Sequence, residues 1–232
     1  QHFADDVFRA LRGETLQGEN SNLSDLDLAL QLSDAQGDHF TDEVPSPTGR
    51  PDGLDGERIW IRQTLHGRFS QVLARVAIAI ARSAQHYGDA KVRFQLPVDM
   101  RPRVEGIRST ANLAGGVVME VTPSTTPESW QQVIRHKLER REEAAIPRFM
   151  KCVPVRLLCW FSLKIIQRAN RRLAAKRVHS GRYRTSGIIS NLGLIRTAHY
   201  QGGGFMSHSI FFIPPDFDTT AFFLAVSGTE QG

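Results

Sequence analysis

The segment Leu96-Pro97-Val98-Asp99-Met100-Arg101-Pro102-Arg103 marks the end of a strand and decides how the rest of the chain is interpreted. The apolar residues of the range 91–98 predict the strand itself. Pro102 has no backbone N–H, so the strand must end there. Asp99 and Arg101 are two residues apart, and side chains at that spacing on a strand lie on the same face. We therefore expect an ion pair or one shared docking surface at this point.

The residues on both sides of this strand predict interspersed helices and strands. The range 71–87 is apolar almost all round and is followed by Gly88, which is typical of a buried helix. Helices are also predicted at 5–13, 130–143 and 155–178, and strands at 21–38, 58–65, 115–122, 186–190, 205–213 and 221–226. The pattern indicates a mixed α/β (α+β) lobe.

The chain divides into unequal parts at a polar loop rich in Pro and Gly. We expect residues 1–36 to be the remnant of a first lobe, 37–56 a linker or crossover loop, and 57–232 a second lobe. We also expect the chain to be part of a longer or split protein.

The composition is that of a globular protein, with 232 residues of which 41% are hydrophobic and 23% charged. The sequence has no apolar run long enough for a membrane span and no signal-peptide pattern at its start. Cys152 and Cys159, seven residues apart on a predicted helix, lie too far apart to bridge. These features favour a reducing, cytoplasmic setting and imply no metal.

Charge is distributed unevenly along the chain. Residues 1–60 contain thirteen acids and four arginines, whereas residues 134–185 contain fifteen Lys and Arg and three Glu. The basic helix that follows Pro154 allows three interpretations: a docking face for an acidic acyl carrier or for CoA phosphates, a surface for anionic membranes, or a solvated face without a partner. Nucleic-acid binding is the least favoured, because no recognised motif accompanies the charge.

Three segments in order resemble the second, C-terminal lobe of the chloramphenicol-acetyltransferase-like superfamily. They are the helix at 69–81, the strand end at 96–103, and Asn112-Leu113-Ala114-Gly115-Gly116. The helix from Trp130 and the strand end Ser190-Asn191-Leu192-Gly193 follow in the same order. The superfamily includes condensation domains, polyketide-associated acyltransferases and wax ester/diacylglycerol acyltransferases. The resemblance covers about residues 57–232.

The resemblance implies a mixed sheet flanked by helices, forming half of a two-lobed acyltransferase. Such enzymes transfer an acyl group from a CoA or carrier-protein phosphopantetheine thioester to a hydroxyl or amine, without a bound cofactor. The implied partners are acyl-CoA or an acyl carrier protein, the other lobe on the same or a separate chain, and, as a further alternative, an anionic membrane to which a cytoplasmic enzyme would bind peripherally.

The same resemblance implies a catalytic His in an H-H-x-x-x-D-G loop of the first lobe, acting as a base toward the acceptor. His2-Phe3-Ala4-Asp5-Asp6 matches H-x-x-x-D, but Gln1 stands in place of the first His and Val7 in place of the Gly. We favour the start of a helix for this segment and expect the base outside this chain. The alternatives are a non-catalytic docking or scaffold module of the same fold and a lipid-surface wax ester/diacylglycerol synthase-like enzyme.

Several residues are candidates for the substrate site or for its support. Ser190 and Asn191, with Gly193, could donate hydrogen bonds to a substrate carbonyl or an oxyanion, or could simply form a turn. Asn112 and Gly115 could line the acyl tunnel, although a turn and close packing explain them slightly better. For Asp99 and Arg101 we favour a structural role at the lobe interface.

Overall fold

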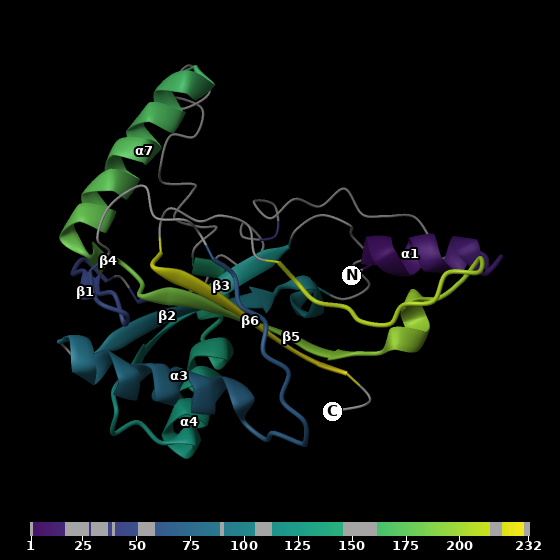
Figure 1. The fold of residues 1–232 in the computed structure, drawn as a ribbon, viewed down its shortest axis with the longest axis horizontal. Coiled ribbons are helices and arrows are strands. Elements are labelled where there is room, and N and C mark those ends of the chain that lie inside the picture. Colours follow the sequence, from purple (N-terminus) through teal and green to yellow (C-terminus); the bar gives the residue numbers. More distant parts are fainter. Residues whose placement is uncertain are drawn as a thin grey trace.

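The computed structural model describes residues 2–16, 28, 37–38, 40–50, 59–88, 91–104, 113–145, 162–213 and 220–229. Its centre is a mixed four-stranded sheet with the order β3-β2-β5-β6 (Figure 1). The strands are β2 (Val92–Asp99), β3 (Ala114–Val121), β5 (Gly187–Ile195) and β6 (Phe222–Thr229). The expected mixed α/β class, with a mixed sheet flanked by helices, is therefore confirmed.

The directions of the strands fix which strand ends lie together. β2 and β3 are antiparallel, with Val92 opposite Val121 and Asp99 opposite Ala114. β5 runs parallel to β2, with Phe94 opposite Gly187, and β6 runs parallel to β5. The C-terminal ends of β2, β5 and β6 and the N-terminal end of β3 therefore all lie at one end of the sheet.

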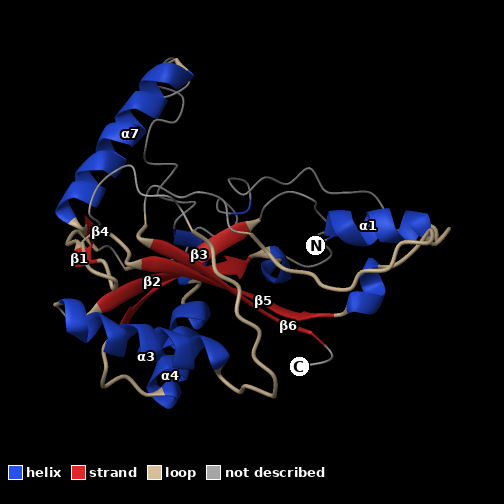
Figure 2. Cartoon of the chain, in the orientation of Figure 1, coloured by secondary structure: helices blue, strands red, loops and turns tan. Residues whose placement is uncertain are grey.

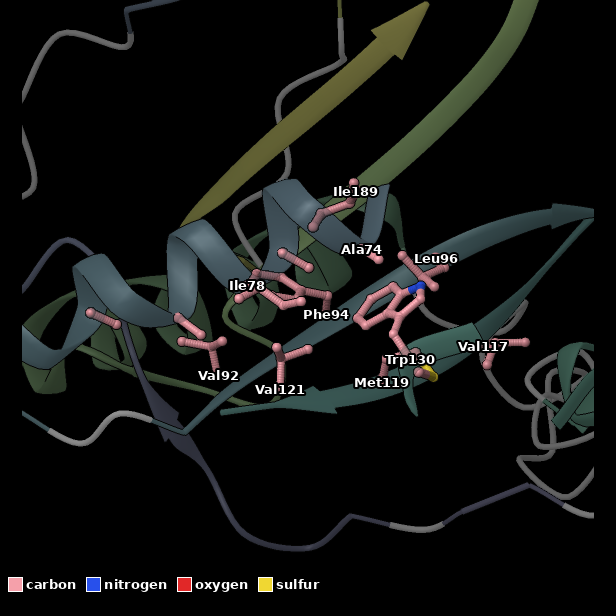
Figure 3. Packing of buried hydrophobic residues seen from close by; sticks show 13 residues of the cluster. Ala74, Ile78, Val92, Phe94, Leu96, Val117, Met119, Val121, Trp130 and Ile189 are labelled. Carbon is pink, nitrogen blue, oxygen red and sulfur yellow. The ribbon is translucent and has the colours of Figure 1, made fainter. Parts of the chain in front are cut away.

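The helix α3 (Val72–Ala84) and the helix α4 (Pro127–Glu139) cover one face of this sheet (Figure 2). The buried face of α3 consists mostly of alanines, whose small side chains let the helix lie close to the strands. A 3-10 turn, η1 (Gln85–Tyr87), continues α3 to Gly88. Phe94 of β2 and Trp130 of α4 fill the space between the layers (Figure 3). Each large side chain buried here contributes about 1.5 to 3 kcal/mol to folding.

The start of α4 is fixed by a capping box. The Thr126 hydroxyl accepts a hydrogen bond from the Ser129 backbone N–H, and the Thr126 N–H donates to the Ser129 hydroxyl at 3.1 Å. Pro127 suits the first turn of a helix, where no hydrogen bond to its nitrogen is needed. The sequence prediction of one helix at 130–143 was inaccurate, because α4 ends at Glu139 and a separate 3-10 turn, η3 (Glu142–Ala144), follows.

The remaining elements lie around this core. The helix α1 (His2–Leu11) packs on the 3-10 turn η4 (Thr197–Tyr200), which directly follows β5. The short strands β1 (Val44–Pro45) and β4 (Arg182–Tyr183) pair antiparallel beside the base of the helix α7 (Leu163–Ser180). Another 3-10 turn, η2 (Arg101–Arg103), follows β2.

Two of the predicted strands are wrong. Residues 59–66 form no strand, and Ile59 and Ile61 are more than four-fifths exposed. The range 205–213 forms only an isolated bridge between Gly202 and Phe205. A segment with alternating apolar residues forms a strand only where a neighbouring strand can pair with it. These two segments instead contact each other through the stacked rings of Trp60 and Phe211, whose centroids are 6.0 Å apart.

Other predictions lie wholly or partly outside the described residues. The predicted strand at 21–38 falls there except for Leu28, Gly37 and Asp38, as do residues 155–161 of the predicted basic helix and both cysteines. Residues 40–50, from the expected linker, pack against the lobe through β1.

Candidate functional site

The candidate site is the end of the sheet where β2 and β5 finish and β3 begins. Asp99 is the last residue of β2 and Arg101 follows it in η2, whereas Gly115 lies in the first part of β3. The Ser190–Gly193 segment lies in the middle of β5, so the prediction that the strand ends there was wrong, because β5 continues to Ile195. Three motifs that are far apart in the sequence thus come to the same end of the sheet, as the strand directions and the register of β2 with β5 require. In open α/β sheets, ligands bind at the C-terminal ends of parallel strands.

Asp99 and Arg101 form an ion pair that shapes the turn after β2. The Arg101 guanidinium donates to Asp99 Oδ1 at 2.9 Å, and the Arg101 backbone N–H donates to the same oxygen at 3.0 Å. Arg101 belongs to η2 and not to the strand, so the turn brings the pair together. Between them, Met100 is fully buried and its N–H donates to the Leu113 carbonyl. The pair therefore holds the junction between β2 and the start of β3.

Leu192 and Gly193 form an irregularity in β5, directly after Ser190 and Asn191, which pair regularly with Ala225 and Val226. The pairing with β6 passes from Asn191 opposite Val226 to Leu194 opposite Gly228, so two residues of β5 are left between paired positions. Asn191 Oδ1 accepts a hydrogen bond from the Gly193 N–H at 3.0 Å, and Gly193 has a φ of 70°. Bulges of this kind redirect side chains and are common beside active sites.

Ser190 keeps its hydrogen-bonding capacity in this arrangement. Its side chain is half-buried, and its hydroxyl makes no hydrogen bond to any other described residue. Asn191 is exposed, and its side-chain amide nitrogen likewise donates to none of the described groups. Both a hydroxyl donor and an amide donor are thus placed at the middle of β5, directly before the bulge.

Gly115 has a packing role that the structure makes explicit. A Cβ at this position would lie 2.2 Å from the Glu143 carbonyl oxygen and 2.9 Å from Met100 Sδ. Only glycine lets β3 approach η3 this closely. Asn112, the other residue expected to line the tunnel, lies outside the described residues.

A buried carboxylate lies behind this edge and was not predicted from the sequence. Glu143 is fully buried, and its Oε1 is 2.7 Å from Arg103 Nε. Arg103 also donates to the Leu138 carbonyl at 2.9 Å. The Arg103 side chain borders an open groove of about 430 Å³ on α4, whose other lining residues are Gln131, Ile134, Arg135, Leu138 and Glu139. The run of charges around 101–103 is the only signal in the sequence for this site.

A second buried network lies at the opposite, N-terminal end of β2. The fully buried Arg93 binds Asp42 through two hydrogen bonds, at 2.9 and 3.0 Å, and also binds Glu120 at 2.6 Å. Hydrogen bonds from Arg93 hold the pKa of Asp42 below its usual value. Burial would raise the pKa of Glu120, but hydrogen bonds from Lys91 and Arg93 outweigh it and lower that pKa. We regard this network as structural, since it lies at the end of the sheet opposite the candidate site.

A lysine on α4 makes a similar connection. Lys137 is buried and binds Glu142 at 2.8 Å and also Asp38. Burial would lower the pKa of Lys137, but the two carboxylates outweigh it and raise that pKa. Both networks link the acidic segment 38–42 to the lobe.

The segment that matches H-x-x-x-D is helical. His2 begins α1, and Asp5 and Asp6 lie in the same helix, so these residues do not form a loop. The helix rests against the chain beyond β5, where Arg12 donates to the carbonyls of His199 and Gln201 at 3.3 and 3.0 Å. α1 therefore lies beyond the sheet end that carries the candidate residues (Figure 1).

Within the described part of the chain, no group of three or more His, Cys, Asp or Glu side chains is arranged to hold a metal ion. None of the described helices is long and apolar enough to cross a membrane. Comparison with protein-family models, curated proteins and solved structures found no match to this chain.

Proposed function

We propose that this chain forms the C-terminal lobe of a condensation-type acyltransferase. The observation that supports this proposal is the common sheet end, where the Asp99 turn, the β5 bulge and the start of β3 come together. The mixed sheet flanked by helices is compatible with a lobe of the chloramphenicol-acetyltransferase-like fold.

In the proposed reaction, a hydroxyl or amine of the acceptor attacks the carbonyl carbon of an acyl thioester. A His on the first lobe removes the acceptor proton, and the carbonyl oxygen becomes an oxyanion. The C–S bond then breaks, and the thiolate leaves with the proton that the His has taken up. In this scheme the present lobe supplies the wall of the site and hydrogen bonds to the oxyanion.

Ser190 and Asn191 are the residues to which we assign the oxyanion contact. Each has a donor that no described residue occupies, and both lie directly before the bulge at Leu192 and Gly193. Removal of one such donor lowers kcat by about 10² to 10³ in other acyl-transfer enzymes. We assign Asp99 and Arg101 to holding the strand end in place.

The donor would be CoA or a carrier-bound phosphopantetheine, both of which carry negative charge. The chain has a net charge of +5, and fifteen of its 29 Lys and Arg residues lie in the range 134–185. Positive charge raises the rate of encounter with such a donor.

The proposal is tested with the complete gene product, using acyl-CoA and acyl-carrier thioesters with alcohol and amine acceptors. We expect Ser190→Ala to lower kcat about a hundredfold with little change in KM. Ser227→Ala, on an exposed serine of the neighbouring β6, is the matched control and should have no effect. Unchanged kcat in Ser190→Ala would remove the oxyanion role, and a gene product without an H-H-x-x-x-D-G loop would overturn the enzyme assignment.

One observation favours a second candidate, a non-catalytic docking module of the same fold. Gly115 is accounted for by packing against η3, and Asn191 by the turn it forms with Gly193. Binding of acyl-CoA without turnover by the complete protein would support this candidate.

A further inference from the structure

Most of the helix α7 stands away from the sheet (Figure 1). Its base is fixed by Gly181, whose N–H donates to the Arg177 and Val178 carbonyls and whose carbonyl accepts from the Ser46 N–H. Partly buried side chains occur only at residues 174, 175, 177 and 178, close to this base. The preceding residues of the helix with described side chains are exposed.

The exposed part of α7 carries a row of positive charges. Lys164, Arg168, Arg172 and Lys176 are spaced four residues apart, so their side chains follow one another along one face. The sequence of the helix contains no Asp or Glu to pair with them, although it also contains Arg171 and Arg177. Like charges at this spacing destabilise a helix by a few tenths of a kcal/mol per pair. An anionic partner would remove this repulsion.

A row of apolar residues lies directly beside the charged row. Ile165, Ala169 and Leu173 are also spaced four residues apart, each one position after a basic residue. Ile165 is 53% exposed and Leu173 46% exposed, and Leu163 at the start of the helix is 75% exposed. A helix at a lipid interface uses both an apolar row and a basic row.

We propose that α7 is a membrane-surface helix that binds bilayers containing anionic lipids. The helix would lie in the plane of the interface, with Ile165 and Leu173 inserted at the boundary of the acyl chains. The basic row would contact the phosphates and carboxylates of the headgroups, and the 18 residues would span about 27 Å of surface. This inference does not depend on the proposed acyl transfer.

The same helix could in principle meet an acidic protein, but the arrangement favours the membrane. An acidic protein would be recognised by the charged row, and the apolar row beside it would need a matching groove. A bilayer satisfies both rows at once, and its anionic headgroups attract each basic side chain near the surface.

The test is co-sedimentation of the full chain with vesicles of phosphatidylcholine alone and of phosphatidylcholine mixed with phosphatidylserine. We expect binding to the mixed vesicles only, weakened by added salt. Arg168→Glu with Arg172→Glu should lower the partition coefficient about tenfold or more. These changes replace three like-charge pairs at i,i+4 with two opposite-charge pairs, 164/168 and 172/176, and one like-charge pair, 168/172, so they do not weaken the helix itself.

A matched control reverses two charges elsewhere. Arg82→Glu with Arg135→Glu, on exposed positions of α3 and α4, gives the same net charge and should leave binding within about twofold of the parent chain. A third variant, Ile165→Ser with Leu173→Ser, keeps every charge and should also lower binding about tenfold.

Each result supports or overturns the proposal. Loss of binding in both α7 variants, with the control unchanged, supports it. Equal binding to both kinds of vesicle, absence of binding, or equal loss in the control overturns it. If only the charge variant loses binding and the Ser variant binds as the parent does, the apolar row does not insert and the basic row serves an acidic macromolecule instead.

Discussion

The Arg93 guanidinium, fully buried in β2, binds both carboxylate oxygens of Asp42, a residue 51 positions earlier in the chain. It also lies 4.0 Å above the Phe40 ring and donates to the Arg184 carbonyl at 3.1 Å. One side chain thus connects the segment around β1, the sheet and the residues before β5. A buried charge is tolerated only when it is paired and hydrogen-bonded in this way.

We predict that Arg93→Met destabilises the protein by about 1 to 3 kcal/mol, because the hydrogen bonds from the buried guanidinium to Asp42, Glu120 and the Arg184 carbonyl are lost. Arg93→Lys should also destabilise it, since one ammonium cannot make the hydrogen bonds that Nε, Nη1 and Nη2 of the guanidinium make to Glu120, the Arg184 carbonyl and Asp42. Asp42→Asn should cost less, because Arg93 keeps Glu120. Urea unfolding followed by circular dichroism measures these differences, and a loss below about 0.5 kcal/mol for Arg93→Met would show that the pair is not structurally important.

The same network predicts how stability depends on pH. The folded protein holds the pKa values of Asp42 and Glu120 below their ordinary values of 3.8 and 4.5. Below about pH 4.5 the unfolded chain therefore binds more protons than the folded protein does. The stability that these two carboxylates contribute is lost as the pH falls further, through their folded-state pKa values. Asp42→Asn with Glu120→Gln should flatten this acid-side loss in urea unfolding between about pH 3 and pH 6. If the unfolding free energy of the double variant falls with pH as steeply as that of the parent protein, Asp42 and Glu120 are not the groups responsible.

Gly115 offers a test of packing with a close control. We expect Gly115→Ala to cost about 1 to 3 kcal/mol, because its Cβ would meet the Glu143 carbonyl and β3 or η3 would have to shift. Gly228→Ala in β6 should be nearly neutral, since its Cβ would be in ordinary contact with Leu194 at 3.8 Å. Thermal unfolding of the two variants compares them directly. Equal stability of the two would show that the contact with η3 is not tight.

The core elements could be predicted from sequence because their signals are local. The apolar residues of α3 followed by Gly88, and the run that ends at Pro102, each indicate an element without reference to distant residues. Strand direction was not predictable in this way. The meeting of the β2 and β5 ends depends on the parallel register of Phe94 with Gly187, which no short segment encodes.

The features that the sequence did not predict also depend on contacts between residues that are far apart in the chain. In the sequence, Arg93 is a charged residue within an apolar strand, which does not indicate burial. Its burial depends on its ion pair with Asp42, a residue far away in the sequence. Glu143 is buried because η3 turns back against Gly115, which the expectation of one continuous helix concealed. The alternation at 59–65 had no strand to pair with, so it produced an exposed segment that forms no strand.

Substitutions of Asn191 can distinguish the structural role of its side-chain oxygen from the chemical role that we propose for its amide nitrogen. Its Oδ1 accepts from the Gly193 N–H, whereas its amide nitrogen is the donor that the proposed mechanism uses. Asn191→Ala removes both and should cost about 1 kcal/mol of stability together with activity. Asn191→Asp retains the acceptor but not the donor, so it should preserve thermal stability while lowering kcat of the complete enzyme about tenfold or more. If Asn191→Asp turns over substrate as fast as the parent protein, the amide contributes only to the turn in β5, and Ser190 alone remains as the oxyanion donor.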